Sequence, residues 1–275
     1  MVKIIDGEAF KNMLVMAAGA VEEKKQEINE LNVFPVPDGD TGTNMSLTLN
    51  AAATELMKFE KPTLGKAVDT TSSALLRGAR GNSGVITSLL FRGFGKRLKE
   101  LPQANAKEFA EALMEGVNTA YKAVMKPAEG TILTVSRLAA ERALREANST
   151  AEVDQVLDGA IQAAKEALER TVEQNPVLEK GRRGGCRRLR LGHHFGEHAR
   201  RFDRQKTQSK FNFLPQKPKP SPVAAADFSQ FDEGEINFAY CTEFIAARED
   251  KKRSVDKLRK YLETIGDCVV AVERR

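Results

Sequence analysis

Two carboxylates stand one residue apart in a proline- and glycine-rich segment near the N-terminus. Residues 32–45 read Asn-Val-Phe-Pro-Val-Pro-Asp-Gly-Asp-Thr-Gly-Thr-Asn-Met, and the acids are Asp38 and Asp40. Hard divalent cations such as Mg2+ take oxygen ligands, usually one or two carboxylates together with substrate phosphates and water. The residue types and their spacing therefore predict a divalent cation held against phosphate.

The flanks of the acidic pair favour a preorganised site. Gly39 and Gly42 remove side chains where a backbone passes close to a ligand, and a helix expected near Thr43 offers N–H groups and a positive dipole end to an anion. Pro35 and Pro37 fix φ and stiffen the loop. An ordinary Asx-type turn before a helix N-cap uses the same residue types and is the alternative interpretation.

A second glycine-rich segment precedes another expected helix. Residues 77–84 read Arg-Gly-Ala-Arg-Gly-Asn-Ser-Gly, and the apolar pattern of a helix over 84–99 follows. Glycines at this start let backbone amides turn toward a ligand, and Asn82 and Ser83 could donate to phosphate oxygens. The same two side chains could instead cap the helix.

A third helix start carries Glu-Gly-Thr-Ile over residues 129–132. Gly130 precedes a helix predicted over 131–147, with Thr131 at its start. A capped helix that follows Pro127 is an equally good interpretation of this segment.

These segments need helices to position them. From residue 6 to about residue 174, apolar residues recur three and four positions apart, which is typical of amphipathic helices. Short connections between long helices favour antiparallel neighbours, hence a mainly α bundle or closed helical barrel. The acidic loop and the 82–84 bend would then meet at one end. The helices are predicted over 7–31, 43–58, 64–77, 84–99, 107–125, 131–147 and 151–174.

Residues 32–45 resemble the nucleotide-binding domain of the dihydroxyacetone kinase type (DhaL-like), most closely the N-terminal domain of the ATP-binding subunit of bacterial fatty acid kinase. The resemblance implies a barrel of antiparallel helices in which Asp38 and Asp40 hold two Mg2+ ions that bridge the phosphates of ATP. Dihydroxyacetone kinases have a third aspartate upstream, where the nearest candidate here is Asn32, a neutral ligand.

The same resemblance implies which residues bind the nucleotide. The segment after the acids orients phosphate, the glycine-rich bend binds phosphate, and the Gly-Thr turn lies near the nucleotide. These residues are Thr41, Gly42, Thr43, Asn44, Gly81, Asn82, Ser83, Gly84 and Thr131.

The C-terminal part changes to an alternating pattern. Residues 236–244 alternate as a strand does, a helix is expected over 254–264, and residues 268–272 suggest a second strand. This part resembles the opening of the middle domain of fatty acid kinase, in which a cysteine matching Cys241 belongs to a metal site completed by later histidines. No such histidines follow before Arg275, so we expect no intact zinc site.

Residues 181–204 differ from the rest of the chain. They hold all three histidines, eight arginines and two acids, a formal charge of +6 against +5 for the whole protein. An arginine-rich arm for nucleic acid and a His/Cys metal cluster are two interpretations. We favour a third, a translational frame change that replaces the last helix of the barrel and leaves an apolar seam, which puts the activity of this exact chain in question. Residues 205–226 suggest a disordered linker on composition.

Composition sets the broad class. An apolar share of 41% supports a packed core, and three widely spaced cysteines argue against a disulfide framework. No apolar run reaches the roughly twenty residues of a membrane span, and no signal pattern opens the chain, so we expect a cytoplasmic protein. The division predicted is a helical ATP/Mg-binding domain over 1–180, the basic segment and linker over 181–228, and the start of an α/β domain over 229–275.

Together these features predict phosphoryl transfer, with two Mg2+ ions neutralising ATP oxygens. No general base is visible in the sequence, and the resemblance implies that the acceptor arrives on another polypeptide, a DegV-type protein carrying a fatty acid. The ATP-binding subunit of dihydroxyacetone kinase and a non-catalytic nucleotide-binding scaffold are the alternatives. Nucleic acid is not an expected partner, and a homodimer stays open.

Overall fold

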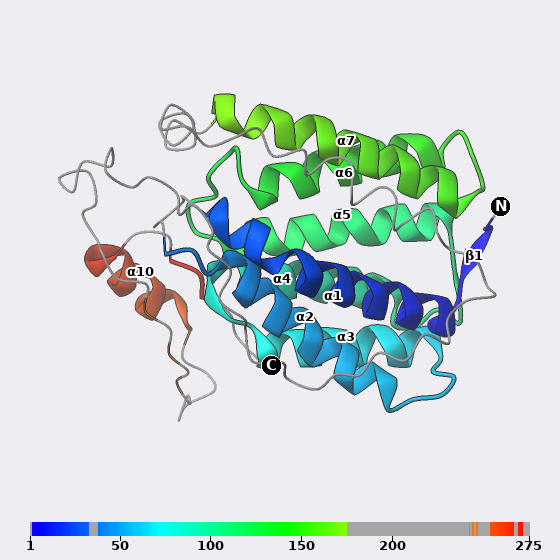
Figure 1. The fold of residues 1–275 in the computed structure, drawn as a ribbon, viewed down its shortest axis with the longest axis horizontal. Helices are drawn as coiled ribbons and strands as arrows, with labels where there is room; N and C mark the ends of the chain where they lie inside the picture. Colours follow the sequence, from blue (N-terminus) through cyan, green and yellow to red (C-terminus); the bar gives the residue numbers. More distant parts are fainter. Residues whose placement is uncertain are drawn as a thin grey trace.

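The computed structural model describes residues 2–32, 38–174, 242, 244, 246, 254–266 and 269–271. Within these residues the chain is mainly helical, as predicted (Figure 1). The helices are α1 (Gly7–Glu30), α2 (Thr41–Met57), α3 (Leu64–Gly78), α4 (Gly81–Leu98), α5 (Ala106–Ala123), α6 (Ile132–Ala147), α7 (Val153–Gln174) and α10 (Asp256–Ile265).

The seven helices predicted before residue 175 are all present, with bounds within three residues of the prediction. The largest difference is at the start of α4, which begins at Gly81 and not at residue 84. The apolar pattern used for the prediction begins only at Val85, whereas the polar first turn of the helix lacks that pattern.

Successive helices pack against one another from α1 to α7, so the loops alternate between the two ends of the bundle (Figure 1). One end carries a short antiparallel ladder between β1 (Ile4–Ile5) and β2 (Ala104–Asn105), in which Ile4 lies opposite Asn105. The sequence analysis did not predict this ladder. The other end carries the connections around residues 31–40, 79–80 and 124–131, and we call it the site end.

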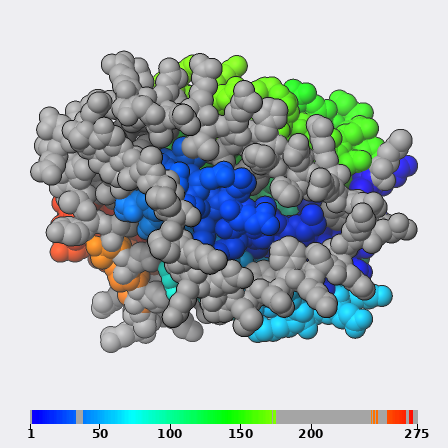
Figure 2. Space-filling view, viewed as in Figure 1, coloured from blue at the N-terminus to red at the C-terminus, as the bar shows by residue number. Residues whose placement is uncertain are grey.

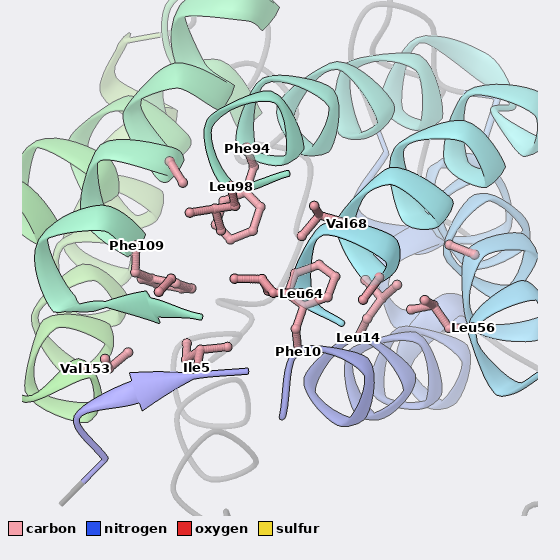
Figure 3. Packing of buried hydrophobic residues seen from close by; sticks show 14 of the residues in the cluster. Ile5, Phe10, Leu14, Leu56, Leu64, Val68, Phe94, Leu98, Phe109 and Val153 are labelled. Atoms are coloured by element: carbon pink, nitrogen blue, oxygen red, sulfur yellow. The ribbon is translucent and has the colours of Figure 1, made fainter. Parts of the chain in front are cut away.

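Apolar side chains fill the bundle toward the ladder end. The ring of Phe94 in α4 stacks on Phe10 of α1 at 5.7 Å between centroids and meets Phe109 of α5 edge-on at 5.5 Å. Figure 3 shows these rings with Leu64 and Leu14 in one cluster, to which Ile5 of β1 also belongs. Burial of these side chains is the main stabilisation of the fold.

Toward the site end, the side chains between α1 and α2 become polar. In α1, buried Phe10 and Leu14 are followed by Glu22, which is only partly buried, and α2 runs from polar Ser46 to buried Leu56. Because neighbouring helices are antiparallel, their polar halves gather at one end. Between α1 and α2 the bundle is therefore apolar at the ladder end and polar at the site end.

Several predictions fall outside the described residues. These are the stiff Pro35 and Pro37 loop, the basic segment 181–204, the linker 205–226, Cys241 and most of the strand predicted over 236–244. Residues 269–271 are described, and Val270 forms a single antiparallel bridge with Val124. In the described part of the chain, no helix is both long enough and apolar enough to cross a membrane.

Candidate nucleotide and metal site

The acidic pair lies at the start of α2. Asp40 is the N-cap residue of the helix, and Asp38 receives a hydrogen bond from the side-chain amide of Asn32, which is 8% exposed. Burial of the carboxyl and, next, the negative charge of Asp40 raise the pKa of Asp38, while the Asn32 bond acts in the opposite direction. Asp38 and Asp40 therefore lie close enough for their negative charges to repel each other.

Helix α1 holds the first turn of α2. Asn29 Oδ1 accepts from Thr43 N at 3.0 Å, and Asn29 Nδ2 donates to Thr43 Oγ1 at 3.0 Å. Gly42 lies so close to α1 that a Cβ there would stand 2.0 Å from Lys25 O. Gly42 therefore has a packing role that the sequence analysis did not predict, because it lets α2 approach α1 directly behind the acidic pair.

The start of α4 packs onto α2. Arg80 N donates to Thr48 Oγ1 at 3.2 Å, and a Cβ at Gly84 would stand 2.4 Å from the same hydroxyl oxygen. Gly81 has φ 58°, and a Cβ there would stand 2.4 Å from Asn44 Nδ2. The structure thus brings the glycine-rich bend against the first turns of α2, as the antiparallel arrangement requires.

The two helix starts that meet here differ in their N-cap residues from α1, α3, α5 and α6. A side-chain oxygen of the N-cap residue accepts a backbone N–H in α1, α3, α5 and α6. Neither Asp40 of α2 nor Arg80 of α4 makes such a bond within the described residues. Asn82 and Ser83 lie in the first turn of α4 and are not its N-cap, which argues against the capping interpretation. At α2, Asn29 of α1 accepts the Thr43 N–H in place of the N-cap residue. The two helix starts lie side by side, and the N-terminal ends of helices are suited to an anion.

A polar cluster continues from the acidic pair between α1 and α2. Ser46, 1% exposed, donates to Glu22, which also pairs with Lys25, and Asn50 Nδ2 lies 3.2 Å from Ser46 Oγ. Burial alone would raise the pKa of Glu22, but the bonds from Lys25 and Ser46 outweigh burial and hold the pKa below its usual value. Glu22 therefore stays ionised and paired behind the site.

A third element of the site end is the turn before α6. Thr131 is the N-cap of α6, and Gly130, with φ 73°, donates its N–H to Thr134 Oγ1 at 2.9 Å. Thr134 is fully buried, and its hydroxyl donates to Glu129 Oε2 at 2.8 Å. Arg137 Nη2 also donates to Glu129 Oε2, at 3.0 Å. This network holds the conformation of the Glu129–Thr131 turn.

The structure therefore gathers the predicted residues at one end of the bundle. Asn32, Asp38 and Asp40 are adjacent, the segment 41–44 forms the first turn of α2, and Gly81 contacts Asn44. Thr131 starts a helix at the same end, beside α5. Their roles as ligands stay predictions.

Asn29, Thr48 and Thr134 were missed by the sequence analysis. The Thr-x-x-Thr spacing of residues 131–134 is a capping-box pattern that could have identified Thr134. Asn29 and Thr48 act on residues 14 and 32 positions away in the sequence, and no local pattern indicates such partners.

The donor set fits a divalent cation that also binds phosphate. Asp40 lies close enough to Asp38 for its negative charge to raise the pKa of Asp38. A cation bound between the two carboxylates would remove this repulsion. In the described part of the chain, no group of three or more His, Cys, Asp or Glu side chains forms a complete metal cage. A cation here would therefore keep positions for phosphate and water, which is how Mg2+ is commonly bound.

Comparison with known proteins agrees with this geometry. The profile of the DAK2 domain matches residues 35–192, more than half of the chain. The profile of the middle domain of FakA-like fatty acid kinase proteins matches residues 237–275.

Curated relatives extend the similarity. Protein YloV of Bacillus subtilis is 36% identical over 284 residues, which cover 98% of this chain and 50% of YloV. Uncharacterized proteins of Staphylococcus saprophyticus and Staphylococcus aureus are 46% and 44% identical over 180 residues, or 66% of this chain and 33% of each relative. The chain thus spans half the length of YloV and a third of these staphylococcal relatives.

Proposed function

Because this chain belongs to the DAK2-domain family and also matches the FakA-like middle domain, we propose that it is the nucleotide-binding part of an ATP-dependent kinase. In this proposal it acts in the cytoplasm and transfers the γ-phosphoryl group of ATP to a fatty acid presented by a DegV-type partner protein. The observation that carries the proposal is the acidic pair at the start of α2, packed against the start of α4.

The protein's own residues mainly bind and orient. Asp38 and Asp40 would hold two Mg2+ ions, with Asn32 as a neutral neighbour, and the bound cations would neutralise negative charge on the phosphates. Thr43 and Asn44, with Asn82 and Ser83 opposite, would orient the phosphate oxygens. Asn29 and Thr48 keep the two helix starts together, so the site is preorganised before nucleotide arrives.

The acceptor chemistry favours a fatty acid over a hydroxyl compound. A fatty acid is ionised at neutral pH, so its carboxylate attacks phosphorus without first losing a proton. A hydroxyl acceptor such as dihydroxyacetone needs a base to take its proton. The match of residues 237–275 to the FakA-like middle domain also supports a fatty acid as the acceptor.

Calorimetry with Mg-ATP tests nucleotide binding directly. We expect the wild type to bind and Asp38→Ala and Asp40→Ala to lose most of the heat, while Asp69→Ala, an exposed acid on α3, behaves as wild type. Equal heats from wild type, Asp38→Ala and Asp40→Ala would overturn the proposal.

Phosphoryl transfer separates a kinase from the alternatives. With a lipid-loaded DegV-type protein and Mg-ATP, the expected product is an acyl phosphate, which hydroxylamine traps as a hydroxamate. Nucleotide binding without any hydroxamate would favour the non-catalytic scaffold, and ATP-dependent phosphorylation of dihydroxyacetone would favour the glycerone kinase alternative.

A further inference from the structure

The C-terminal segment contacts the bundle at the site end. Val270 pairs antiparallel with Val124, which follows the last residue of α5. Arg259 of α10 donates from Nη2 to Ala271 O at 3.1 Å, which ties the helix to the same short segment. Figure 2 shows the orange and red atoms of this segment at the same end of the molecule as the lighter blue atoms of the start of α2.

The side chain of Val270 packs against a small apolar cluster at the site end. It joins a small cluster around Leu89 and Leu133, each 2% exposed, together with Val85 and Ile86. Leu89, Val85 and Ile86 belong to the first half of α4, directly after Asn82 and Ser83, and Leu133 lies two residues after Thr131. The cluster on which Val270 packs thus joins α4 and α6, the helices that carry two of the predicted phosphate-binding elements.

The segment 269–271 meets the bundle at Val270, whereas α10 buries no residue of its own. The apolar side chains Leu258, Tyr261 and Ile265 of α10 are 40%, 60% and 54% exposed. Val270 is therefore a side chain that joins the segment to the site end.

We propose that Val270 is a positioning residue for the nucleotide site. By packing on the cluster in which α4, α5 and α6 meet, it orders the start of α4 relative to the Glu129–Thr131 turn. Thermodynamic linkage then requires that nucleotide binding and docking of residues 254–271 strengthen each other. The nucleotide part of this inference rests on the proposed function, whereas the effect on the helix starts does not.

Three variants of the full chain test this role. Val270→Asp places a charge in the apolar cluster, Val270→Ile keeps the contact, and Ile265→Asp is a matched control that adds a charge to the same segment at an exposed position. The first measurement is amide hydrogen exchange of residues 85–89 and 133–137 without nucleotide. The second is the Kd for a non-hydrolysable Mg-ATP analogue.

We expect Val270→Asp to speed exchange in both helix segments about tenfold and to raise Kd about five- to tenfold, within the usual range of coupling between sites. Val270→Ile and Ile265→Asp should stay within about twofold of wild type in both measurements. Exchange of the α1 core amides, residues 10–21, reports global unfolding. If Val270→Asp accelerates these too, the milder Val270→Ala replaces it.

The outcomes are separable from those of the proposed function. Unchanged exchange at 85–89 and 133–137 in the Val270 variants would overturn the inference whatever the nucleotide does. Faster exchange with unchanged Kd would reduce Val270 to a structural contact and also overturn it. A wild type that binds no nucleotide would refute the proposed function and, with it, the nucleotide part of the inference, and the exchange data would still decide whether Val270 orders the helix starts.

Discussion

Asn29 forms two hydrogen bonds with Thr43, from Asn29 Nδ2 to Thr43 Oγ1 and from Thr43 N to Asn29 Oδ1, each 3.0 Å long. They join the end of α1 to the first turn of α2. This pair places the acidic residues against the bundle. Replacement of Asn29 by Ala leaves the Thr43 N–H in a partly buried position without its partner, which costs about 1–3 kcal/mol. We expect the melting temperature to fall by about 3–8 °C and Mg-ATP affinity to fall with it.

The matched control for Asn29 is Asn148→Ala, because Asn148 is exposed at the opposite end of the bundle. Differential scanning calorimetry and titration with Mg-ATP measure both quantities. A melting temperature equal to that of Asn148→Ala would mean that the Asn29–Thr43 pair does not hold α2 in place.

Because Asp38 and Asp40 repel each other, we expect the stability of the protein to depend on both pH and Mg2+. The pKa of Asp38 is raised in the folded protein, so its contribution to stability is present below the ordinary aspartate pKa and is lost as pH rises through the raised value. At neutral pH the pair is therefore repulsive, and Asp38→Asn should raise the melting temperature of the metal-free protein by about 2 °C.

Mg2+ should stabilise the wild type at pH 7 by relieving the same repulsion, and Asp38→Asn should lose most of that gain. Thermal melts with and without millimolar Mg2+ check both statements, with Asp69→Asn on the exposed surface of α3 as the control. If Asp38→Asn gained as much from Mg2+ as the wild type does, the cation would be bound elsewhere.

The hydrogen bonds of Thr134 can be tested for their role in holding the turn before α6. Its buried hydroxyl accepts from Gly130 N and donates to Glu129, so Thr134→Val, which preserves shape, leaves Gly130 N unpaired at a cost of about 1–3 kcal/mol. The Thr134 hydrogen bond is also the largest cause that lowers the pKa of Glu129. We therefore expect the Glu129 pKa to rise toward its usual value in Thr134→Val.

An NMR titration of the Glu129 carboxyl and a thermal melt measure these two effects, and Thr134→Ser should restore both. A Glu129 pKa that does not change in Thr134→Val would show that the remaining partners of Glu129, Arg137 and Tyr121, suffice to hold the turn.

Two glycines in helices offer a direct comparison of packing. A Cβ at Gly42 would meet the backbone oxygen of Lys25 at 2.0 Å, whereas a Cβ at Gly159 would meet the flexible side chain of Glu146 at 2.6 Å. We expect Gly42→Ala to destabilise the fold by about 1–3 kcal/mol or more. Gly159→Ala should be neutral or stabilise by up to about 1 kcal/mol, because alanine favours helix.

Denaturant unfolding of the two variants gives the free energies of unfolding. Equal effects at the two positions would mean that α2 can move away from α1 at little cost, and the close approach behind the acidic pair would then not be required for stability.

The helices were predictable because their signal is local. Buried positions such as Phe10, Leu14, Ala18 and Val21 recur at the helical period, so the pattern gives each helix and its buried face. The exception was the first turn of α4, where polar residues interrupt the apolar pattern although the backbone is already helical.

The sequence indicated which acids and glycines form the candidate site, but only part of the role of each glycine. Gly42 and Gly84 were predicted to approach a ligand, and the structure shows that each also allows two helices to pack closely. A glycine looks the same in the sequence whether the neighbour it admits is a phosphate or another helix. The neighbour is known only when the helices are placed.

By itself, the amino-acid sequence determined where helices begin and end, which face of each is apolar, and that two carboxylates lie in a loop between helices. Only the tertiary structure decided that Asn29 holds Thr43, that Thr48 receives the Arg80 amide and that Val270 packs beside Leu89 and Leu133. Periodicity reports which side of a helix turns inward but not which side chain it meets there. Those partners are far apart in the chain and are selected by the packing of whole helices.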